Sequence, residues 1–170
     1  MRGQNLKFQE TGVRDIVKDV FIPWYNSFKF LFSSSLLPYE RKANGGQLLL
    51  FKPNEAPITD NMMDLWIISF TQSLIKFFRQ QMKEYRLDTV VPRLIKFIDH
   101  LTNWYVRMNR KRLRGETASD KDWFAAVHTL FFVLYQTTVM LSPFVPFLTE
   151  FFYQNLKSRL DFHAETDLSE

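Results

Sequence analysis

Basic and polar side chains recur every three or four residues between Arg93 and Arg114, which is the spacing of one face of an α-helix. The members of this series are Arg93, Lys96, His100, Asn103, Arg107, Arg110 and Arg114, and Lys111 and Arg112 add charge near its end. Guanidinium groups form paired hydrogen bonds with phosphate oxygens, and a positive surface speeds encounters with polyanions. The chemistry that this pattern favours is therefore phosphate binding, as on a nucleic-acid interface.

The positive charge is concentrated in one part of the chain. Residues 76–114 contain 11 Lys and Arg against three Asp and Glu, a net charge of +8, whereas the whole chain of 170 residues has +4. Most charged helix faces are solvated surfaces on which both signs alternate and form ion pairs. Residues 107–114 instead contain five cations and no acidic residue. Two interpretations stay open, a solvated face and a binding surface for nucleic acid or another polyanion.

Covalent chemistry is not expected from this composition. The chain has no Cys, five Gly, and three His that are scattered at positions 100, 128 and 163. These counts exclude thiolate zinc sites and cysteine nucleophiles, and they leave little from which to build a glycine-rich phosphate loop. We therefore expect no catalytic residue, no metal site and no cofactor in this chain. Glu10 and Asp15 come too early for a transit peptide, and we expect a cytoplasmic protein.

Hydrophobic periodicity predicts an all-α bundle of about five helices. The expected helices span about residues 11–32, 60–85, 89–113, 119–142 and 146–156. Pro23 should kink or restart the first helix, because proline removes a backbone donor. Residues 33–59 contain clustered Ser, Gly and Pro and are expected to form a long irregular connection. We assign residues 1–160 to one domain and residues 161–170 to an acidic tail.

Two apolar stretches need an interpretation. The helix at 89–113 has an apolar face, on which Trp104 and Tyr105 are expected to pack in the core rather than stack on bases. Residues 123–148 include no charged side chain, and a run of this length could cross a bilayer. Polar side chains and Pro143 interrupt the run. We therefore expect a helix buried in the bundle, with a membrane-spanning helix as the alternative.

Four blocks of the sequence resemble one enzyme family. The most specific is LTNWYVRMNRKRL at residues 101–113, which closely resembles the LTNWYVR-NRRRLKG stretch of eukaryotic-type isoleucyl-tRNA synthetases. The block EYRLDTVVP at residues 84–92 resembles the helix hairpin just before that stretch. The block LSPFVPFLTE at residues 141–150 is similar to the MAPFTPFLSE element that closes the family's bundle. Residues 5–26 resemble the segment that follows the catalytic lysine loop.

The resemblance implies the anticodon-binding helical domain of a class I aminoacyl-tRNA synthetase, which contacts the anticodon stem-loop. The family's ATP-binding signatures, the HIGH-type motif and the KMSKS-type loop, do not occur in this sequence. We therefore expect a piece of a larger enzyme with no catalytic activity alone. The parent would use ATP and Mg²⁺ to join isoleucine to its tRNA. The implied partners are that tRNA and the catalytic and C-terminal domains of the parent, and we expect a monomer without a membrane partner.

The resemblance and the charge pattern indicate the same helix as the binding surface. The residues expected to contact tRNA are Arg93, Lys96, His100, Asn103, Arg107, Arg110, Lys111 and Arg114. The cations would bind backbone phosphates, and Asn103 would contact the edge of an unstacked base. Two alternatives stay open. One is the same domain of a valyl- or leucyl-tRNA synthetase, and the other is a helical module whose basic face docks on a protein.

Overall fold

The computed structural model describes residues 10–53 and 55–161, which form helices and one isolated β-bridge. The elements are α1 (Glu10–Ile16), η1 (Val17–Phe21), α2 (Ile22–Phe30), η2 (Leu31–Leu36), α3 (Leu37–Lys42), α4 (Met62–Lys83), α5 (Leu87–Asp99), η3 (His100–Val106), α6 (Arg110–Leu113), α7 (Asp120–Leu141) and α8 (Pro146–Lys157). The η segments are π-helical, so their backbone N–H groups bond five residues back instead of four. The expected all-α fold is confirmed.

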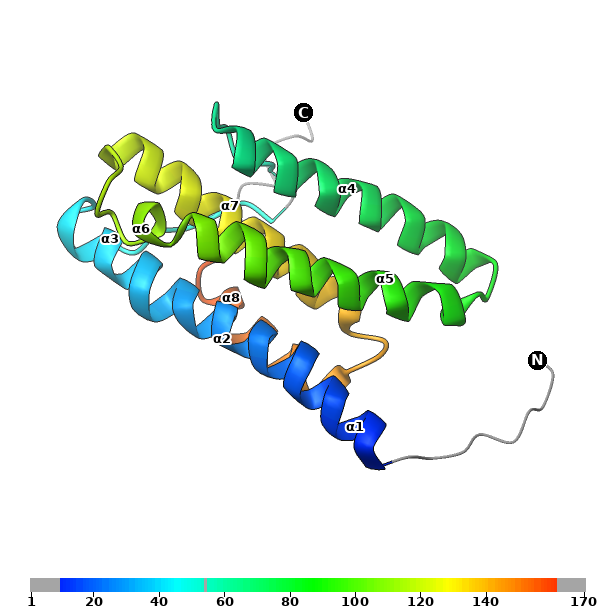
Figure 1. Ribbon diagram of the computed structural model, residues 1–170. Coiled ribbons are helices and arrows are strands. Elements are labelled where there is room, and N and C mark those ends of the chain that lie inside the picture. Colours follow the sequence, from blue (N-terminus) through cyan, green and yellow to red (C-terminus); the bar gives the residue numbers. More distant parts are fainter. Residues whose placement is uncertain (1–9, 54, 162–170) are drawn as a thin grey trace.

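Residues 10–42 form one continuous helical rod, α1–η1–α2–η2–α3, along one side of the bundle (Figure 1). Pro23 and Pro38 each lie in the first turn of the α-helix that follows a π segment. Pro23 has no backbone N–H to donate, and it lies where the rod changes from π-helical to α-helical geometry. The backbone stays helical through this point, so the rod does not break at Pro23.

The expectation that residues 33–59 form an irregular connection is wrong for their first part. The segments η2 and α3 extend the rod to Lys42. Serine has only a moderate helix propensity, but the Ser33 hydroxyl donates a hydrogen bond to the Lys29 carbonyl at 2.8 Å, which satisfies it inside the helix. The side chain of Leu36 is fully buried in the core. Packing therefore outweighs the local preference for a turn.

The actual connection, residues 43–61, crosses the bundle and docks on it at Phe51. The Phe51 N–H donates to the Arg159 carbonyl at 2.8 Å, and the Asp161 N–H donates to the Phe51 carbonyl at 3.0 Å. These bonds form a single parallel bridge with the segment after α8. The Phe51 ring stacks on Phe131 of α7 with ring centroids 4.3 Å apart. The connection is thus fixed to the core although it has no helix of its own.

A buried ion pair fastens the same region. The guanidinium of Arg159, after α8, pairs with the carboxylate of Glu40 on α3. The Glu40 carboxylate also accepts a hydrogen bond from the Leu49 N–H at 2.8 Å. Both charged side chains are buried, so each depends on the other for compensation. The remainder of the expected acidic tail, residues 162–170, lies outside the described residues.

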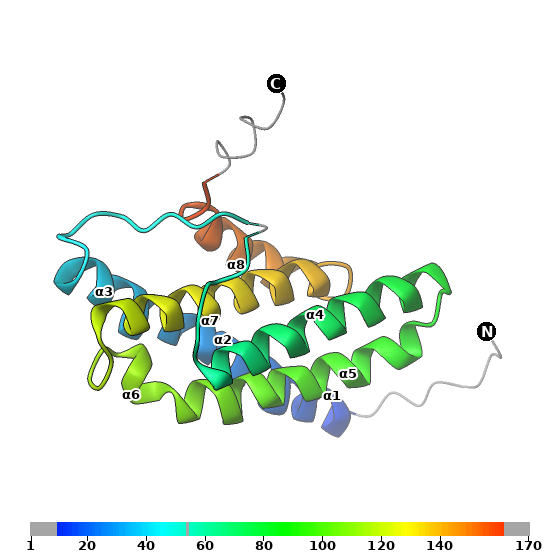
Figure 2. The same ribbon diagram turned by 90° about the horizontal axis from the view of Figure 1, so that it is seen from above.

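The central helix of the bundle is α7, which contacts α4, α6, α8 and η2. In Figure 2 it lies between α8 and the pair formed by α4 and α5. It is long and apolar enough to cross a membrane, but 72% of its most apolar window is buried inside the bundle. A helix that is apolar on all sides belongs in a core or in a membrane. The apolar run that begins at Trp123 therefore forms a buried bundle helix, as the sequence predicts.

Capping groups define the ends of the helices around the site. The Ser119 hydroxyl accepts a hydrogen bond from the Asp122 N–H at 3.3 Å and caps α7. The Asn61 side chain caps α4 by accepting from the Met63 N–H at 2.9 Å. Gly115 ends α6 with a φ of +72°, and a β-carbon there would lie 2.6 Å from the Trp123 ring. Only glycine combines that backbone conformation with so close a neighbour.

Candidate nucleic-acid interface

The residues expected to bind RNA lie on α5, η3 and α6, which run between α4 and α2 on one side of the bundle (Figure 1). The helical path begins at Leu87, close to the expected start, and is interrupted at Asn109. The exposed members are Arg93, Lys96, Asn103, Arg107, Arg110 and Lys111, and the half-buried members are His100 and Arg114. All eight expected residues are therefore accessible to a ligand.

The series does not form the single face that α-helical spacing predicts. Its first group lines a groove between α4 and α5, and the members are Arg93, Lys96 and His100. Its second group lines a groove between α2 and η3, and the members are Asn103, Arg107 and Arg110. The π segment η3 accounts for the division, because a π turn holds about one residue more than an α turn and rotates the next turn of the helix by roughly 100°. The protein presents two neighbouring cationic groups.

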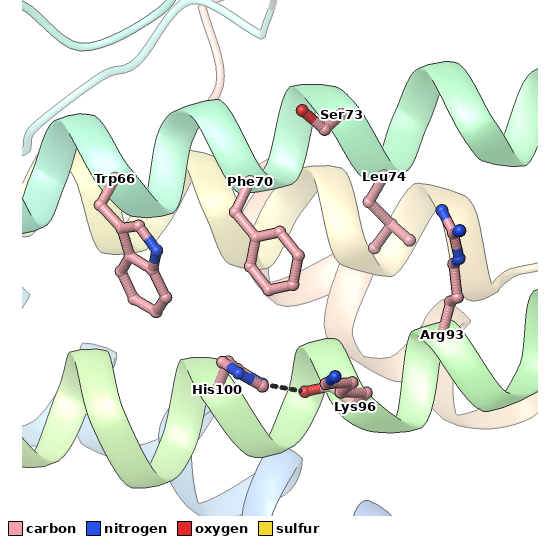
Figure 3. Close-up of a pocket in the computed structure, with 7 residues that line it drawn as sticks. All are labelled: Trp66, Phe70, Ser73, Leu74, Arg93, Lys96 and His100. Atoms are coloured by element: carbon pink, nitrogen blue, oxygen red, sulfur yellow. Dashed lines mark hydrogen bonds between the residues drawn. The ribbon is translucent and has the colours of Figure 1, made fainter.

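The α4–α5 groove has a volume of about 440 Å³ (Figure 3). It is lined by Trp66, Phe70, Ser73, Leu74, Arg93, Lys96 and His100. The rings of Trp66 and Phe70 lie one turn apart on α4, with centroids separated by 6.0 Å and planes inclined by 25°. Across the groove, His100 Nδ1 is hydrogen-bonded to the Lys96 carbonyl at 2.7 Å. Aromatic rings thus face cationic side chains across one groove.

The α2–η3 groove has a volume of about 360 Å³. On its η3 side, the Asn103 amide nitrogen donates to Asp99 Oδ1 at 2.6 Å, which holds the side chain in place. On its α2 side, the guanidinium of Arg110 lies 5.8 Å from the centroid of the Phe30 ring, and that of Arg114 lies 5.9 Å from it. Stacking on an aromatic face orients a guanidinium without neutralising its charge. This groove is more strongly cationic than aromatic.

Among the eight residues expected to bind RNA, only one cation has an acidic partner in the described part of the chain. Arg114 lies 3.6 Å from the Glu116 carboxylate. The others, Arg93, Lys96, Arg107, Arg110 and Lys111, form no ion pair in the described part of the chain. A typical solvated helix face would pair such charges at i,i+4. The unpaired cations favour the interpretation as a polyanion-binding surface.

Trp104 and Tyr105 have opposite environments, although both were expected in the core. Tyr105 is fully buried, as predicted, whereas the Trp104 side chain is 52% exposed. The expectation for Trp104 is therefore wrong. Trp104 and Tyr105 both belong to η3, and the extra residue in its π turn changes which side chains face the core, as it does for the basic series. Met108, on the same stretch, is also exposed. An exposed indole beside unpaired cations is a suitable platform for an unstacked base.

Arg112 does not belong to the cationic surface, although it lies inside the basic run. Its guanidinium is buried and forms a bidentate pair with the Asp64 carboxylate at 2.8 and 2.7 Å. It also donates to both carboxylate oxygens of Asp122, at 2.8 and 2.6 Å. The Tyr105 hydroxyl donates to Asp64 Oδ1 at 2.6 Å. We call these four residues the Arg112 junction, which joins α4, η3, α6 and the start of α7.

Burial and charge shift the titration of the junction. Burial lowers the pKa of Arg112, but its hydrogen bonds to Asp64 and Asp122 outweigh burial, so the pKa is raised overall. Burial, followed by the negative charge of Asp64, raises the pKa of Tyr105 well above its ordinary value. Arg112 therefore stays charged and Tyr105 stays protonated at neutral pH. The junction positions η3 and α6 while Asp64 and Asp122 compensate its own positive charge.

The sequence contains signals for two features that the spacing of the basic series does not reveal. Arg112 follows the buried Tyr105 by seven residues, so it lies on the apolar face and not on the cationic one. Trp66 and Phe70 are four residues apart on α4. They lie next to the buried face of this helix, which includes Asp64 and Ile67, and not at its centre. Both placements follow from helical periodicity. In the described residues, no group of three His, Cys, Asp or Glu is arranged to hold a metal ion.

Comparison with known proteins agrees with this geometry. Residues 64–168 match the family described as the anticodon-binding domain of tRNA ligase. The chain belongs to this family. It is 46% identical to the probable cytoplasmic isoleucine–tRNA ligase of Dictyostelium discoideum over 98% of the chain, and 47% identical to the cytoplasmic isoleucine–tRNA ligase of Mus musculus over 95%. The corresponding ligase of Arabidopsis thaliana is 48% identical over 92% of the chain.

The chain spans only a small part of these relatives, 15% of the Dictyostelium protein and 12% of the mouse protein. The matched family is a binding domain, and the relatives are named as ligases. The family expected from the resemblance is therefore confirmed, and the expected cytoplasmic setting agrees with the names of the relatives.

Proposed function

We propose that this chain binds the anticodon arm of a tRNA as the anticodon-binding domain of a cytoplasmic isoleucine–tRNA ligase. The main support is the set of accessible cations on α5, η3 and α6 that have no acidic partner in the described residues, in a chain of this family. The proposed contact residues are Arg93, Lys96, His100, Asn103, Arg107, Arg110, Lys111 and Arg114. Six of these residues line the two grooves, which would contact two parts of the same RNA, and Lys111 and Arg114 lie outside them.

The second group is suited to the sugar–phosphate backbone. Arg107 and Arg110 line one groove, Lys111 follows them on α6, and none is neutralised within the described chain. Arg forks bind phosphate oxygens in pairs, whereas Lys supplies a point charge. Contacts of this kind fix the register of an RNA arm without selecting its sequence. Base selection would then fall to Asn103 and to planar groups nearby.

In the parent enzyme, this domain would bind and orient the tRNA while other domains use ATP and Mg²⁺ to attach isoleucine. The partners proposed for the chain are the tRNA and those catalytic and C-terminal domains. We also propose that the domain is a monomer that does not bind a membrane. The burial of α7 within the bundle supports the latter.

The test is a titration of the 170-residue chain with an RNA hairpin that reproduces the isoleucine anticodon arm, at two salt concentrations. We expect binding that weakens with salt, and a double variant Arg107→Ala/Arg110→Ala that binds more weakly. Because two phosphate contacts are lost, the slope of log affinity against log salt should shrink by roughly 1.4 to 1.8. A hairpin altered only in the anticodon reports whether this chain also selects bases.

The matched control is Lys52→Ala/Lys157→Ala. Both lysines are exposed and line neither groove. Lys52 follows Phe51, which pairs with Leu160 just after α8, and Lys157 ends α8, the helix that lies across α7 from α5 (Figure 2). The control should keep both the affinity and the salt slope of the unaltered chain. Equal losses in the two double variants would indicate nonspecific attraction, and the proposed surface would then be wrong. Binding to an acidic protein but not to the hairpin would favour a docking module instead.

A further inference from the structure

The α4–α5 groove has an aromatic wall that the cationic series does not explain. Trp66 is 37% exposed and lies nearly parallel to Phe70. Neighbouring buried positions of α4, such as Ile67, show that this helix has an apolar face elsewhere for the core. Trp66 and Phe70 instead point across the groove toward α5 (Figure 3). Phe70 is partly covered, because it packs on the buried Phe97 ring with centroids 5.3 Å apart, so Trp66 is the more open ring of the pair. An exposed ring gains free energy when another flat ring displaces water from it.

The opposite side of the groove supplies fixed positive charge. The Arg93 guanidinium carbon lies 3.8 Å from the centroid of the Phe77 ring, which holds the charge at one end of the groove. Lys96 lies one turn further along α5 and is exposed. In the described residues neither cation has an ion pair. A planar apolar surface beside two cations matches the base and the phosphate of one nucleotide.

His100 adds a polar group to this arrangement. Its ring lies 5.4 Å from Phe70 and 6.3 Å from Trp66, centroid to centroid. A carbonyl oxygen can only accept a hydrogen bond, so the Nδ1 that contacts the Lys96 carbonyl must be the protonated nitrogen. In the neutral ring, Nε2 is then an acceptor. It is suited to an N–H donor on the edge of a base.

We propose that the α4–α5 groove binds one unstacked nucleotide of the anticodon loop, with its base against Trp66 and Phe70 and its phosphate at Arg93 and Lys96. This inference rests on the proposed function. The groove volume of about 440 Å³ lies within the range of small-ligand sites. Arg107 and Arg110 in the α2–η3 groove bind the backbone, and the α4–α5 groove holds one base in addition to the base edge that Asn103 contacts.

The experiment compares Trp66→Ala with the unaltered chain against a series of anticodon-arm hairpins, each lacking the base at one loop position. Trp66→Ala should weaken binding to the intact hairpin about tenfold, the loss typical of one base–aromatic stack. It should cause no further loss with the one hairpin whose missing base is the base bound in the groove. Trp66→Phe should retain most of the affinity, because a smaller ring still stacks.

Phe147→Ala is the matched control, because Phe147 is 93% exposed on α8 and lines neither groove. It should bind every hairpin as the unaltered chain does. Trp66 is partly exposed, so its truncation should leave the unfolding temperature close to that of the control. If Trp66→Ala binds the intact hairpin normally, or loses the same factor with every hairpin, the groove proposal is wrong and the proposed function stands. If the unaltered chain does not bind the intact hairpin, both are wrong.

Discussion

Arg110 and Arg112 lie two residues apart in the same basic run, but their side chains have opposite environments. Arg110 is exposed, lies 5.8 Å from the Phe30 ring centroid and has no ion pair in the described chain. Arg112 is buried and forms hydrogen bonds with two carboxylates. A count of charges in the sequence does not separate these roles. The position of each residue relative to the apolar face does separate them.

The difference explains how the domain can present charge to RNA and remain folded. Arg112 joins four elements and is compensated by Asp64 and Asp122, so it adds little to the field that RNA would meet. Arg107 and Arg110 form no ion pair in the described chain, so their charge stays available to a ligand. One side chain type therefore serves as a structural junction in one position and as a binding group in another.

The largest expected effect is the loss of the junction in Arg112→Met. Removal of the guanidinium leaves the buried Asp64 carboxylate without its counter-charge, and breaking a buried pair in this way costs about 3–5 kcal/mol. The free energy of unfolding, measured by urea titration, should fall by that amount. The free energy of unfolding of Arg112→Lys should lie between those of the unaltered chain and Arg112→Met, because a single ammonium cannot form both bidentate pairs.

Lys111→Met is the matched control for this variant. It removes a charge from the adjacent, exposed position, and we expect a change of at most about 0.5 kcal/mol. Lys111→Met should lower the affinity for RNA without lowering the free energy of unfolding. Equal urea midpoints for Arg112→Met and Lys111→Met would contradict the contrast between the buried and the exposed cation.

A smaller effect is expected from Tyr105→Phe, which removes the hydroxyl that donates to Asp64 at 2.6 Å. Hydrogen bonds to charged groups contribute about 1.5 kcal/mol or more, so the free energy of unfolding should fall by about that much. Burial and the Asp64 charge raise the pKa of Tyr105 in the folded protein. The unfolded phenol therefore ionises first, and this stabilisation is present below about pH 10 and is lost at higher pH.

The pH dependence of stability tests the role of the Tyr105 hydroxyl more directly than a single measurement at neutral pH. Unfolding free energies of the unaltered chain and Tyr105→Phe, measured from neutral to alkaline pH, should converge as the pH rises above about 10. Other tyrosines and lysines titrate in both proteins and cancel in the difference. A constant difference across this range would show that Tyr105 does not hold its proton more tightly in the folded state, and the polar part of the junction would need a different explanation.

The parts of this fold that depend on local periodicity could be predicted from the sequence. The helices near α4, α7 and α8 follow from apolar spacing and from Ser119 as a cap. The continuation of the first rod to Lys42 could not be predicted, because buried contacts of η2 and α3 outweigh the Ser-rich composition. The course of residues 43–61 depends on Phe51 meeting Leu160, a contact distant in sequence.

For the candidate site, the sequence predicts which cations share a helix, but it does not predict how the fold arranges them. The family resemblance and the spacing both indicated the helix that contains Arg107. The π segment η3 has no marker in residue spacing, and it divides the series and exposes Trp104. The role of Arg112 depends on Asp64 and Asp122, which belong to other helices. Residue spacing predicts the faces of a single helix, whereas a groove or a buried ion pair forms between two helices.

The smallest expected effect concerns His128, a half-buried group whose charged form, unlike that of Arg112, would have no hydrogen-bonded carboxylate among the described residues. His128 lies against the rings of Phe51 and Phe124, and its Nε2 has no hydrogen-bond partner among the described residues. Burial lowers the pKa of His128, and the nearby charge of Glu55 opposes this only in part. The unfolded chain therefore binds a proton first, and stability should fall as the pH drops below about 6.5. His128→Phe keeps an aromatic ring without the titrating nitrogen, so its unfolding free energy should lose this part of the pH dependence. Parallel profiles for the two proteins on the acid side would show that His128 accepts a proton as readily in the fold as outside it.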